Sequence, residues 1–413
     1  MTVIEKFRNL SLSRFLEEIE LNNFSWIVKR LSGNDTGLTG GHQAGLYLPS
    51  VFFKRVIPEI YTTKRYNAYA LIDEGYFPAQ NDSVINLRAI YYNSKYFPEK
   101  KLKKKYDEFR LTRWGGSVSP VQKKENTGSI CLFAIGREQG KLLSVAWVAS
   151  SLAEEDLIEN WLGCEVEPGR FQLSGFSVPP AIHLTLPVEW FNKFPTGRDI
   201  FSYIAQQIPR DSWTQSVDKL LLKRRNLEFE VFEIIEQLDV MPNISKGFTS
   251  VQEFVKYSHS VTNRRKTRTG NSLEFNLESI FLDENISFET QVITENRKKP
   301  DFIFPSGKAY HAVEFPSDEL HMMAAKTCCK DRWRQILNEA NRITTKHLFT
   351  LQQGVSSNQL QEMKDNNVEL VVPEPHLGSF PKEWRKSLFV LDGFVTFIKR
   401  QQEHIPRLEQ WTN

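Results

Sequence analysis

The residues with the clearest chemistry are three acids and a lysine in the second half of the chain. Asp301 precedes a short apolar run, 302–304, and this pattern predicts a buried strand with an acid at its start. Lys326 and Glu339 follow in a basic, amphipathic stretch, and Glu274 lies in an earlier predicted helix. Hydrolysis of a phosphodiester needs carboxylates for a divalent metal, an activated water and a cation near the scissile phosphate. These residue types are therefore typical of a Mg²⁺-dependent phosphodiesterase.

The element expected to position the last acid is a helix over residues 330–345. Helical spacing places Arg332, Ile336 and Glu339 on roughly one face. The adjoining apolar stripe, which should pack the helix against the sheet, is formed by Trp333, Leu337 and Ala340.

One feature departs from the usual nuclease pattern, which has an acid two residues before the lysine. Here Ala324 occupies that position before Lys326. Glu362 and Lys364 have the expected spacing, but they lie in a polar segment that predicts a solvated helix. Two interpretations therefore stay open on the residues alone: a metal site that Glu339 completes in space, or a strand-edge acid beside an exposed amphipathic helix.

Two further groups have the chemistry of base recognition. Lys330 and Arg332 can donate to guanine, and Asp331 between them can accept from cytosine, so the triplet can read G·C pairs in a major groove. Arg225 and Phe229, one helical turn apart, can enclose an extruded base between a guanidinium and a ring. The alternatives are a solvated helix face for the triplet and a core aromatic beneath surface charge for the pair.

A basic tract interleaved with aromatic residues occurs in the first half of the chain. It includes the lysine-rich residues 100–105, followed by Arg110, Arg113 and Trp114. Neutralising phosphates is a natural use of such a tract. The lysine run by itself is equally compatible with a solvated loop. His42, which lies in a separate Gly-rich segment, is by itself compatible with a simple turn.

Composition indicates a globular protein of two domains. The chain has 413 residues, a length that exceeds one ordinary core. Its 40% hydrophobic and 25% charged residues are globular values and exclude a disordered chain. The net charge of +3 does not by itself indicate a nucleic-acid partner. Four cysteines without metal-ligand spacing predict a reducing compartment. With no apolar run long enough for a membrane span and no leader, we expect a soluble, cytoplasmic protein of a bacterial-type cell.

The pattern of elements changes near residue 200. Many short strands separated by turn residues predict a β-barrel or sandwich before it, and helices alternating with short buried strands predict an α/β domain after it. The expected first domain, linker and second domain cover 1–190, 191–212 and 213–413. The expected elements of the second domain include helices at 220–238, 251–261, 272–282 and 330–345, and strands at 289–293, 301–304 and 310–315.

Long, ordered motifs across nearly the whole chain resemble the EcoRII-type restriction endonucleases, a PD-(D/E)XK variant whose acid has moved to the following helix. In the second half these motifs are Lys299-Pro-Asp301-Phe-Ile-Phe, Ala309-Tyr-His311, Glu314-Phe-Pro316, the run from Lys326 to Ala340, and His347-Leu-Phe-Thr-Leu-Gln352. In the first half they are Arg30-Leu-Ser-Gly-Asn-Asp-Thr-Gly37, Thr39-Gly-Gly-His-Gln43, Gly45-Leu-Tyr47, Ala89-Ile-Tyr-Tyr-Asn-Ser94, Thr112-Arg-Trp-Gly115 and Glu125-Asn-Thr-Gly128.

The resemblance implies roles for particular residues. The implied catalytic residues are Glu274, Asp301, Lys326, Glu339 and Tyr310, with Asp301, Glu339 and Glu274 as metal ligands. The implied DNA contacts are Lys330, Asp331 and Arg332 for base readout, Arg225 and Phe229 for a base-flip pocket, and His42, Tyr47, Arg110 and Arg113 for effector DNA. This chain has Phe229 where EcoRII has Tyr, which keeps stacking but removes a hydroxyl.

The resemblance also implies an overall activity. We expect a Mg²⁺-dependent type IIE endonuclease, a homodimer that cuts double-stranded DNA at 5′-CCWGG-3′ before the first C and is stimulated by a second copy of the site. Its first domain would be a pseudobarrel like that of certain plant transcription factors, and its second a restriction-endonuclease-like α/β domain. The main alternative is a non-cleaving, sequence-specific DNA-binding regulator. A DNA methyltransferase is excluded, because the sequence has no Gly-rich methyl-donor loop and no Pro-Cys nucleophile.

Overall fold

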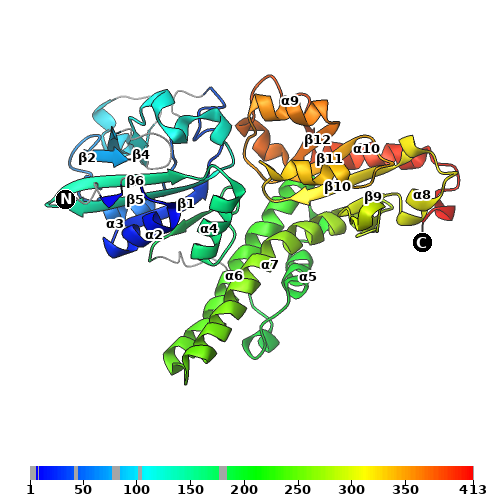
Figure 1. Cartoon of the computed structure of the whole chain (residues 1–413), viewed down its shortest axis with the longest axis horizontal. Coiled ribbons are helices and arrows are strands. Elements are labelled where there is room, and N and C mark those ends of the chain that lie inside the picture. Colours follow the sequence, from blue (N-terminus) through cyan, green and yellow to red (C-terminus); the bar gives the residue numbers. More distant parts are fainter. Residues whose placement is uncertain are drawn as a thin grey trace.

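Two β-sheets lie toward opposite ends of the molecule, and a pair of long helices projects from the region between them (Figure 1). This computed structural model describes residues 6–7, 9–40, 45–76, 84–100, 105–175 and 184–412. The projecting helices are α6 (Val217–Lys246) and α7 (Val251–Asp283). No helix in these ranges has the length and apolar character needed to cross a membrane.

In the described part of the first half, seven strands form one sheet in the order β4-β3-β2-β6-β5-β1-β7. Its central strands are apolar on both faces because each face is covered by a separate hydrophobic core. The strands are β1 (Ser25–Arg30), β2 (Tyr69–Tyr76), β3 (Val84–Tyr92), β4 (Glu108–Thr112), β5 (Ile130–Glu138), β6 (Lys141–Val148) and β7 (Phe171–Leu173). The accompanying helices are α2 (Leu12–Leu21), α3 (Ser50–Val56) and α4 (Leu152–Leu162).

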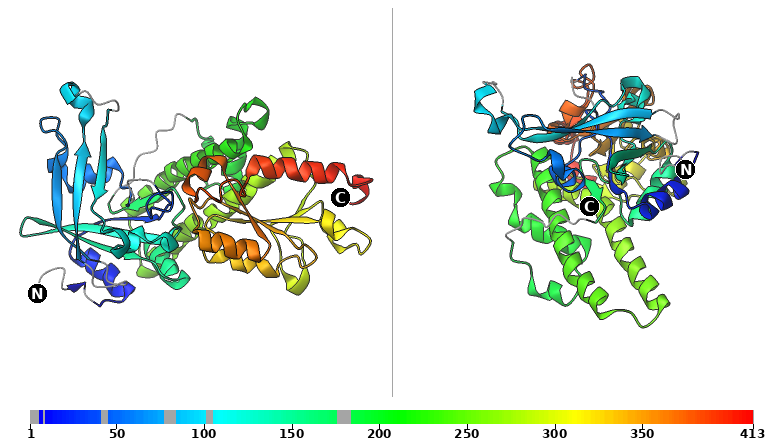
Figure 2. Two further views of the ribbon diagram at one scale, coloured as in Figure 1. Left: turned by 90° about the horizontal axis from the view of Figure 1, so that it is seen from above. Right: turned by 90° about the vertical axis from the view of Figure 1, so that its left-hand side faces the viewer.

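The second half contains a mixed sheet with helices on both faces. Its order is β13-β12-β11-β10-β9-β8, in which β10 to β13 are parallel while β9 runs antiparallel to both β8 and β10. Figure 2 shows helices on either side of this sheet. The strands are β8 (Glu289–Thr290), β9 (Phe302–Phe304), β10 (His321–Lys326), β11 (Lys346–Thr350), β12 (Val368–Val372) and β13 (Phe389–Val390). The remaining helices are α5 (Gly197–Gln207), α8 (Gly307–His311), α9 (Ser357–Asp365) and α10 (Leu391–Glu403).

The expected fold class, a mostly-β first domain followed by an α/β second domain, is confirmed. Three expectations about these elements were wrong. The two helices at 251–261 and 272–282 are one continuous helix, α7, because its polar middle is paired with α6. Arg265 there forms bonds of 2.7–3.0 Å to Glu236, and Arg264 lies 2.7 Å from Asp239.

The segment 310–315, expected as a strand, instead follows the short helix α8 and a turn. Ser306 caps α8 by accepting a bond from the backbone N–H of Ala309 at 3.1 Å, and this local bond selects the helix. The strand β10, by contrast, was not expected. Its sequence, His-Met-Met-Ala-Ala-Lys, contains no β-branched residue, so the usual strand signal is missing.

The third error concerns residues 330–345, which do not form an α-helix. Residues Arg332–Asn338 form a 3₁₀ segment, η11, and Glu339 after it is extended, with φ −94° and ψ 142°. A 3₁₀ segment aligns residues three apart, so Trp333 and Ile336 share its buried face. The face that α-helical spacing assigned to Arg332, Ile336 and Glu339 therefore does not exist.

Candidate active site and DNA-contacting surfaces

Asp301 and Lys326 meet at adjacent strand ends. Asp301 immediately precedes β9, and Lys326 is the last residue of β10, which pairs antiparallel with β9. Asp301 Oδ2 accepts a bond from the backbone N–H of Ala325 at 2.8 Å and lies 3.3 Å from Lys326 Nζ. The acid is 9% exposed, whereas the lysine side chain is half-buried and reaches the surface. This pair therefore places a carboxylate that could bind a metal ion next to an ammonium group.

The missing acid of the usual nuclease pattern has a structural explanation. Ala324 is fully buried in the same core as Trp333 and Ile336, so a carboxylate there would lose its hydration without a partner. The lysine itself ends a strand, although the sequence suggested a position just before a helix.

Two more carboxylates approach this pair from different elements. Glu274 lies on α7, and burial together with the charge of Asp301 raises its pKa, against the lowering influence of Lys326. Glu339 follows η11; burial raises its pKa, with Lys326 acting to lower it and Asp301 to raise it. The structure thus brings Glu274, Asp301, Lys326 and Glu339 into one electrostatically coupled group, as expected from the sequence.

Tyr310 is hydrogen-bonded to an acid outside this group, Glu295. Its hydroxyl donates to Glu295 Oε2 at 2.6 Å, and the side chain is 1% exposed on α8. Burial and this bond raise its pKa. Glu295 Oε2 also accepts the backbone N–H of Asn341 at 3.0 Å. Tyr310 therefore contacts the segment that follows Glu339, through Glu295.

The donor set suits Mg²⁺ in chemistry but is not a closed metal cage. Carboxylate oxygens are the protein ligands that Mg²⁺ prefers, and this ion is usually held by one or two carboxylates together with water and substrate phosphate. Within the described ranges, no three His, Cys, Asp or Glu side chains gather closely enough to hold a metal ion by themselves. The arrangement fits a site that would be completed by phosphate and water.

The triplet Lys330, Asp331 and Arg332 lies at the start of η11 and faces the first domain. Lys330 Nζ donates to Ser129 Oγ, and its backbone N–H donates to Gln352 Oε1 at 2.9 Å. Arg332 and Asp331 are half-buried. The triplet is therefore not a freely solvated helix face, because Lys330 bonds a residue of the first domain and the other two side chains are partly covered.

Arg225 and Phe229 lie one turn apart on α6, as expected, and also face the first domain. Arg225 Nη2 is 2.9 Å from Glu167 Oε2. The guanidinium of Arg170 lies 3.7 Å from the centroid of the Phe229 ring, and that of Arg268 lies 4.8 Å from it. Although burial alone would raise it, the pKa of Glu167 is held at about 2 by Arg268, Arg225 and Arg170. An acid and a guanidinium of the first domain thus cover this pair.

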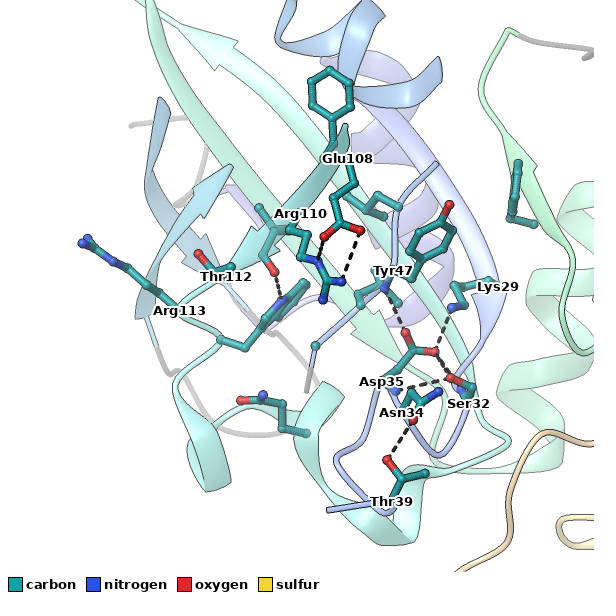
Figure 3. A pocket seen from close by; sticks show the side chains of 18 of the residues that line it. Lys29, Ser32, Asn34, Asp35, Thr39, Tyr47, Glu108, Arg110, Thr112 and Arg113 are labelled. Atoms are coloured by element: carbon teal, nitrogen blue, oxygen red, sulfur yellow. Dashed lines mark hydrogen bonds and ion pairs between the residues drawn. The ribbon is translucent and has the colours of Figure 1, made fainter. Parts of the chain in front are cut away.

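The first sheet carries a cleft of about 1230 Å³ (Figure 3). Tyr47, Arg110 and Arg113, three of the residues expected to bind effector DNA, line it. Arg110 pairs with Glu108 at 3.1 Å, Tyr47 is 63% exposed, and Arg113 extends away from the other labelled side chains. His42 lies outside the described residues.

Sequence reasoning missed the residues that shape this cleft. Asp35, 1% exposed, accepts bonds from Lys29 Nζ at 2.7 Å, the Ser32 backbone at 2.8 Å and the Tyr47 backbone at 2.9 Å (Figure 3). The turn-forming sequence Asn-Asp-Thr-Gly was a signal that could have identified Asp35. The cleft also includes Arg170, the residue that covers Phe229.

A mixed sheet with an acid and a lysine at neighbouring strand ends, flanked by two more acids, defines a nuclease-type α/β domain. Comparison with known sequences agrees with this class. Residues 232–395 match the family described as EcoRII C terminal, and residues 21–175 match restriction endonuclease EcoRII, N-terminal. The type II restriction enzyme EcoRII of Escherichia coli is 41% identical over 406 residues, covering 95% of this chain and 98% of its own. The chain belongs to the EcoRII family of type II restriction endonucleases.

Comparison with solved structures finds two of metal-depleted Ecl18kI, one in complex with uncleaved DNA and one with uncleaved, modified DNA. Each is 17% identical with a TM-score of 0.43. They cover 54% and 55% of this chain, and 87% and 83% of their own chains.

Proposed function

We propose that this restriction endonuclease cuts double-stranded DNA at 5′-CCWGG-3′, before the first C, in a Mg²⁺-dependent reaction stimulated by a second copy of the site. The observation that carries the proposal is the pair of Asp301 and Lys326, 3.3 Å apart, with Glu274 and Glu339 beside it. The catalytic domain would extend over 213–413, with a linker at 191–212 and an effector-binding domain over 1–190.

In this mechanism Asp301 and Glu339, with Glu274, would hold Mg²⁺, which supplies Lewis-acid chemistry at the phosphate when bound. The exposed end of Lys326 lies beside Asp301, where it can stabilise negative charge that develops on the phosphate and orient the attacking water. Burial of Glu274 and Glu339 disfavours their charged forms, so the deprotonated site gains from a bound cation.

Recognition would come from the neighbouring surface. Lys330 and Arg332 would donate to guanine and Asp331 would accept from cytosine, and each good bidentate contact contributes about 1–3 kcal/mol of discrimination. Arg225 and Phe229 would hold an extruded central base. The Phe229 ring would stack on the base, and the Arg225 guanidinium would contact the base from the side. Their helical spacing on α6 supports this assignment.

Stimulation by a second DNA copy would act through the first domain. Tyr47, Arg110 and Arg113 line its cleft, and with His42 they would bind the effector copy. Glu167 and Arg170 contact the proposed base pocket and Ser129 accepts a bond from Lys330, so release of these contacts would open the recognition surface. A symmetric double-strand cut needs two active sites, so the functional unit would be a homodimer.

The deciding experiment is incubation of a plasmid carrying several CCWGG sites with and without Mg²⁺, followed by sequencing of the ends. We expect double-strand breaks before the first C of the site when Mg²⁺ is present, and no breaks without it. Specific binding without cutting under every condition would contradict nuclease activity in this protein and favour the non-cleaving regulator.

A further inference from the structure

The backbone that carries Glu339 has no regular element to hold it. Glu339 is extended at the end of η11, and the next residue, Ala340, has φ +47°. A left-handed conformation is unfavourable for a non-glycine residue, so it persists only where surrounding contacts impose it. The position of a proposed metal ligand therefore depends on what holds residues 340–343.

Side chains from a separate turn hold this backbone on one side. Thr294 Oγ1 accepts the N–H of Ala340 at 3.4 Å, and Glu295 Oε2 accepts the N–H of Asn341 at 3.0 Å. The same Glu295 oxygen accepts the hydroxyl of Tyr310 at 2.6 Å. One carboxylate thus connects the turn at 295–297, the helix α8 and the segment after Glu339.

A buried cation holds the same backbone from the other side. Lys346, the first residue of β11, is 5% exposed, and its Nζ donates to the carbonyls of Ala340 at 3.0 Å and Ile343 at 2.6 Å. Burial lowers the pKa of Lys346, while the charges of Glu295 and Glu339 act to raise it. Lys346 thus ties the backbone at residues 340 and 343 to the start of β11.

We propose that Glu295, Tyr310 and Lys346 form a clamp that positions Glu339 for metal binding. All three side chains hold the backbone of residues 340–343 rather than the Glu339 carboxylate itself, so they are positioning residues. Tyr310 acts through Glu295 and by accepting the N–H of Arg342 at 3.5 Å. The inference rests on the metal-binding role proposed above for Glu339. Partners that orient metal ligands affect metal affinity by about 10–100-fold when they are removed.

The test is a metal titration of the full-length protein with Glu295→Ala, Glu295→Gln and a matched control, Glu284→Ala. Glu284 is also a largely buried carboxylate with two charged partners, Arg210 and Lys399, but it contacts neither 340–343 nor Tyr310. Two readouts are used: Mn²⁺ affinity by calorimetry, and the Mg²⁺ concentration for half-maximal single-turnover cleavage.

We expect Glu295→Ala to weaken both metal readouts by about 10–100-fold, with a near-normal rate at saturating Mg²⁺. Glu295→Gln keeps an acceptor for both donors and should restore most of the affinity. Metal affinity in Glu295→Ala equal to that of Glu284→Ala would overturn the clamp. If Glu295→Ala does not fold, Tyr310→Phe serves in its place. This variant removes the bond to Glu295 and the longer bond from the Arg342 N–H at 3.5 Å, but leaves Glu295 bonded to Asn341. It should show a smaller loss in the same direction, and wild-type affinity there would overturn the clamp.

The two proposals fail in different ways. If the wild-type protein neither binds divalent metal nor cuts DNA, the proposed function is wrong. If the wild type binds metal and cuts while the clamp variants match the Glu284→Ala control, the clamp alone is wrong.

Discussion

Replacing Lys326 by Met should slow DNA cleavage by about 10²–10³-fold, the usual effect of removing one preorganised group that stabilises charge in the transition state. Methionine keeps most of the length of the lysine side chain but removes the ammonium beside Asp301. Specific DNA binding in Ca²⁺ should change little, because the proposed base contacts lie elsewhere, at Lys330 to Arg332.

The stability effect can be bounded from the geometry. Lys326 Nζ and Asp301 Oδ2 are 3.3 Å apart, and at an effective dielectric constant of about 20 two unit charges at such a distance attract by about 5 kcal/mol. The lysine side chain is 29% exposed, so water compensates for much of this attraction. We expect a loss of about 1–3 kcal/mol in the free energy of unfolding, as for a hydrogen bond to a charged group.

The same substitution should also change the pH dependence. Lys326 lowers the pKa values of Glu274 and Glu339, which burial raises, so its loss should move both pKa values further upward. The acid limb of the cleavage profile should therefore shift to higher pH, because more of the carboxylate is protonated at a given pH.

The assay is single-turnover cleavage of a two-site plasmid at saturating enzyme and Mg²⁺, over a range of pH, with Lys364→Met as the control. Lys364 is exposed on α9, in the segment whose acid-to-lysine spacing offered the alternative site. A Lys326→Met rate equal to that of the control would refute the catalytic role. Activity lost from Lys364→Met instead would indicate that the site lies on α9.

Four further predictions concern single positions. Asp301→Ala should abolish cleavage and retain specific binding in Ca²⁺; lost binding would indicate a structural role. Glu339→Gln should raise the melting temperature in metal-free buffer more at pH 8 than at pH 5. The pKa of Glu339 is raised in the folded protein, so its charged form destabilises the fold at a pH above that pKa, and glutamine removes this charge. Equal shifts at the two pH values would contradict this. Arg110→Ala should reduce stimulation by a second DNA copy, measured with one-site and two-site plasmids, and an unchanged ratio would contradict its effector role. Trp333→Ala should lower the free energy of unfolding in urea by about 3–5 kcal/mol, because the ring is 1% exposed; a loss below that of a surface substitution would contradict its core position.

The proximity of the site's charged residues could be predicted from sequence better than the backbone that holds them. Asp301 before a buried strand, Lys326 and the two glutamates are found together, because motif residues and their order report on chemistry. The helix expected at 330–345 was wrong because Trp333 and Ile336 satisfy a period of three as well as an α-helical stripe. A short apolar pattern does not distinguish these two geometries.

Contacts between distant segments could not be predicted from the sequence. Glu167 lies in an irregular stretch between α4 and β7, yet it pairs with Arg225 and Arg268 of the two long helices. Nothing in the local sequence identifies such partners, since each charged residue by itself is equally compatible with a solvated surface. The same holds for Glu295, whose partners Tyr310 and Asn341 become neighbours only when the second sheet forms.

The segment from Lys326 to Asn341 carries both the proposed base-reading triplet and a proposed metal ligand, and its backbone differs from the α-helix that the sequence suggested. It is fixed at its start by Asp301, and near the readout triplet by Gln352, whose Oε1 accepts the backbone N–H groups of Cys329 and Lys330 at 3.0 and 2.9 Å. It is fixed at its end by Glu295. Between these anchors lies a 3₁₀ segment, whose hydrogen bonds are weaker than those of an α-helix. If the triplet reads base pairs as proposed, a shift of it on binding would reach Glu339 along a short, anchored backbone, and cutting would then depend on correct reading.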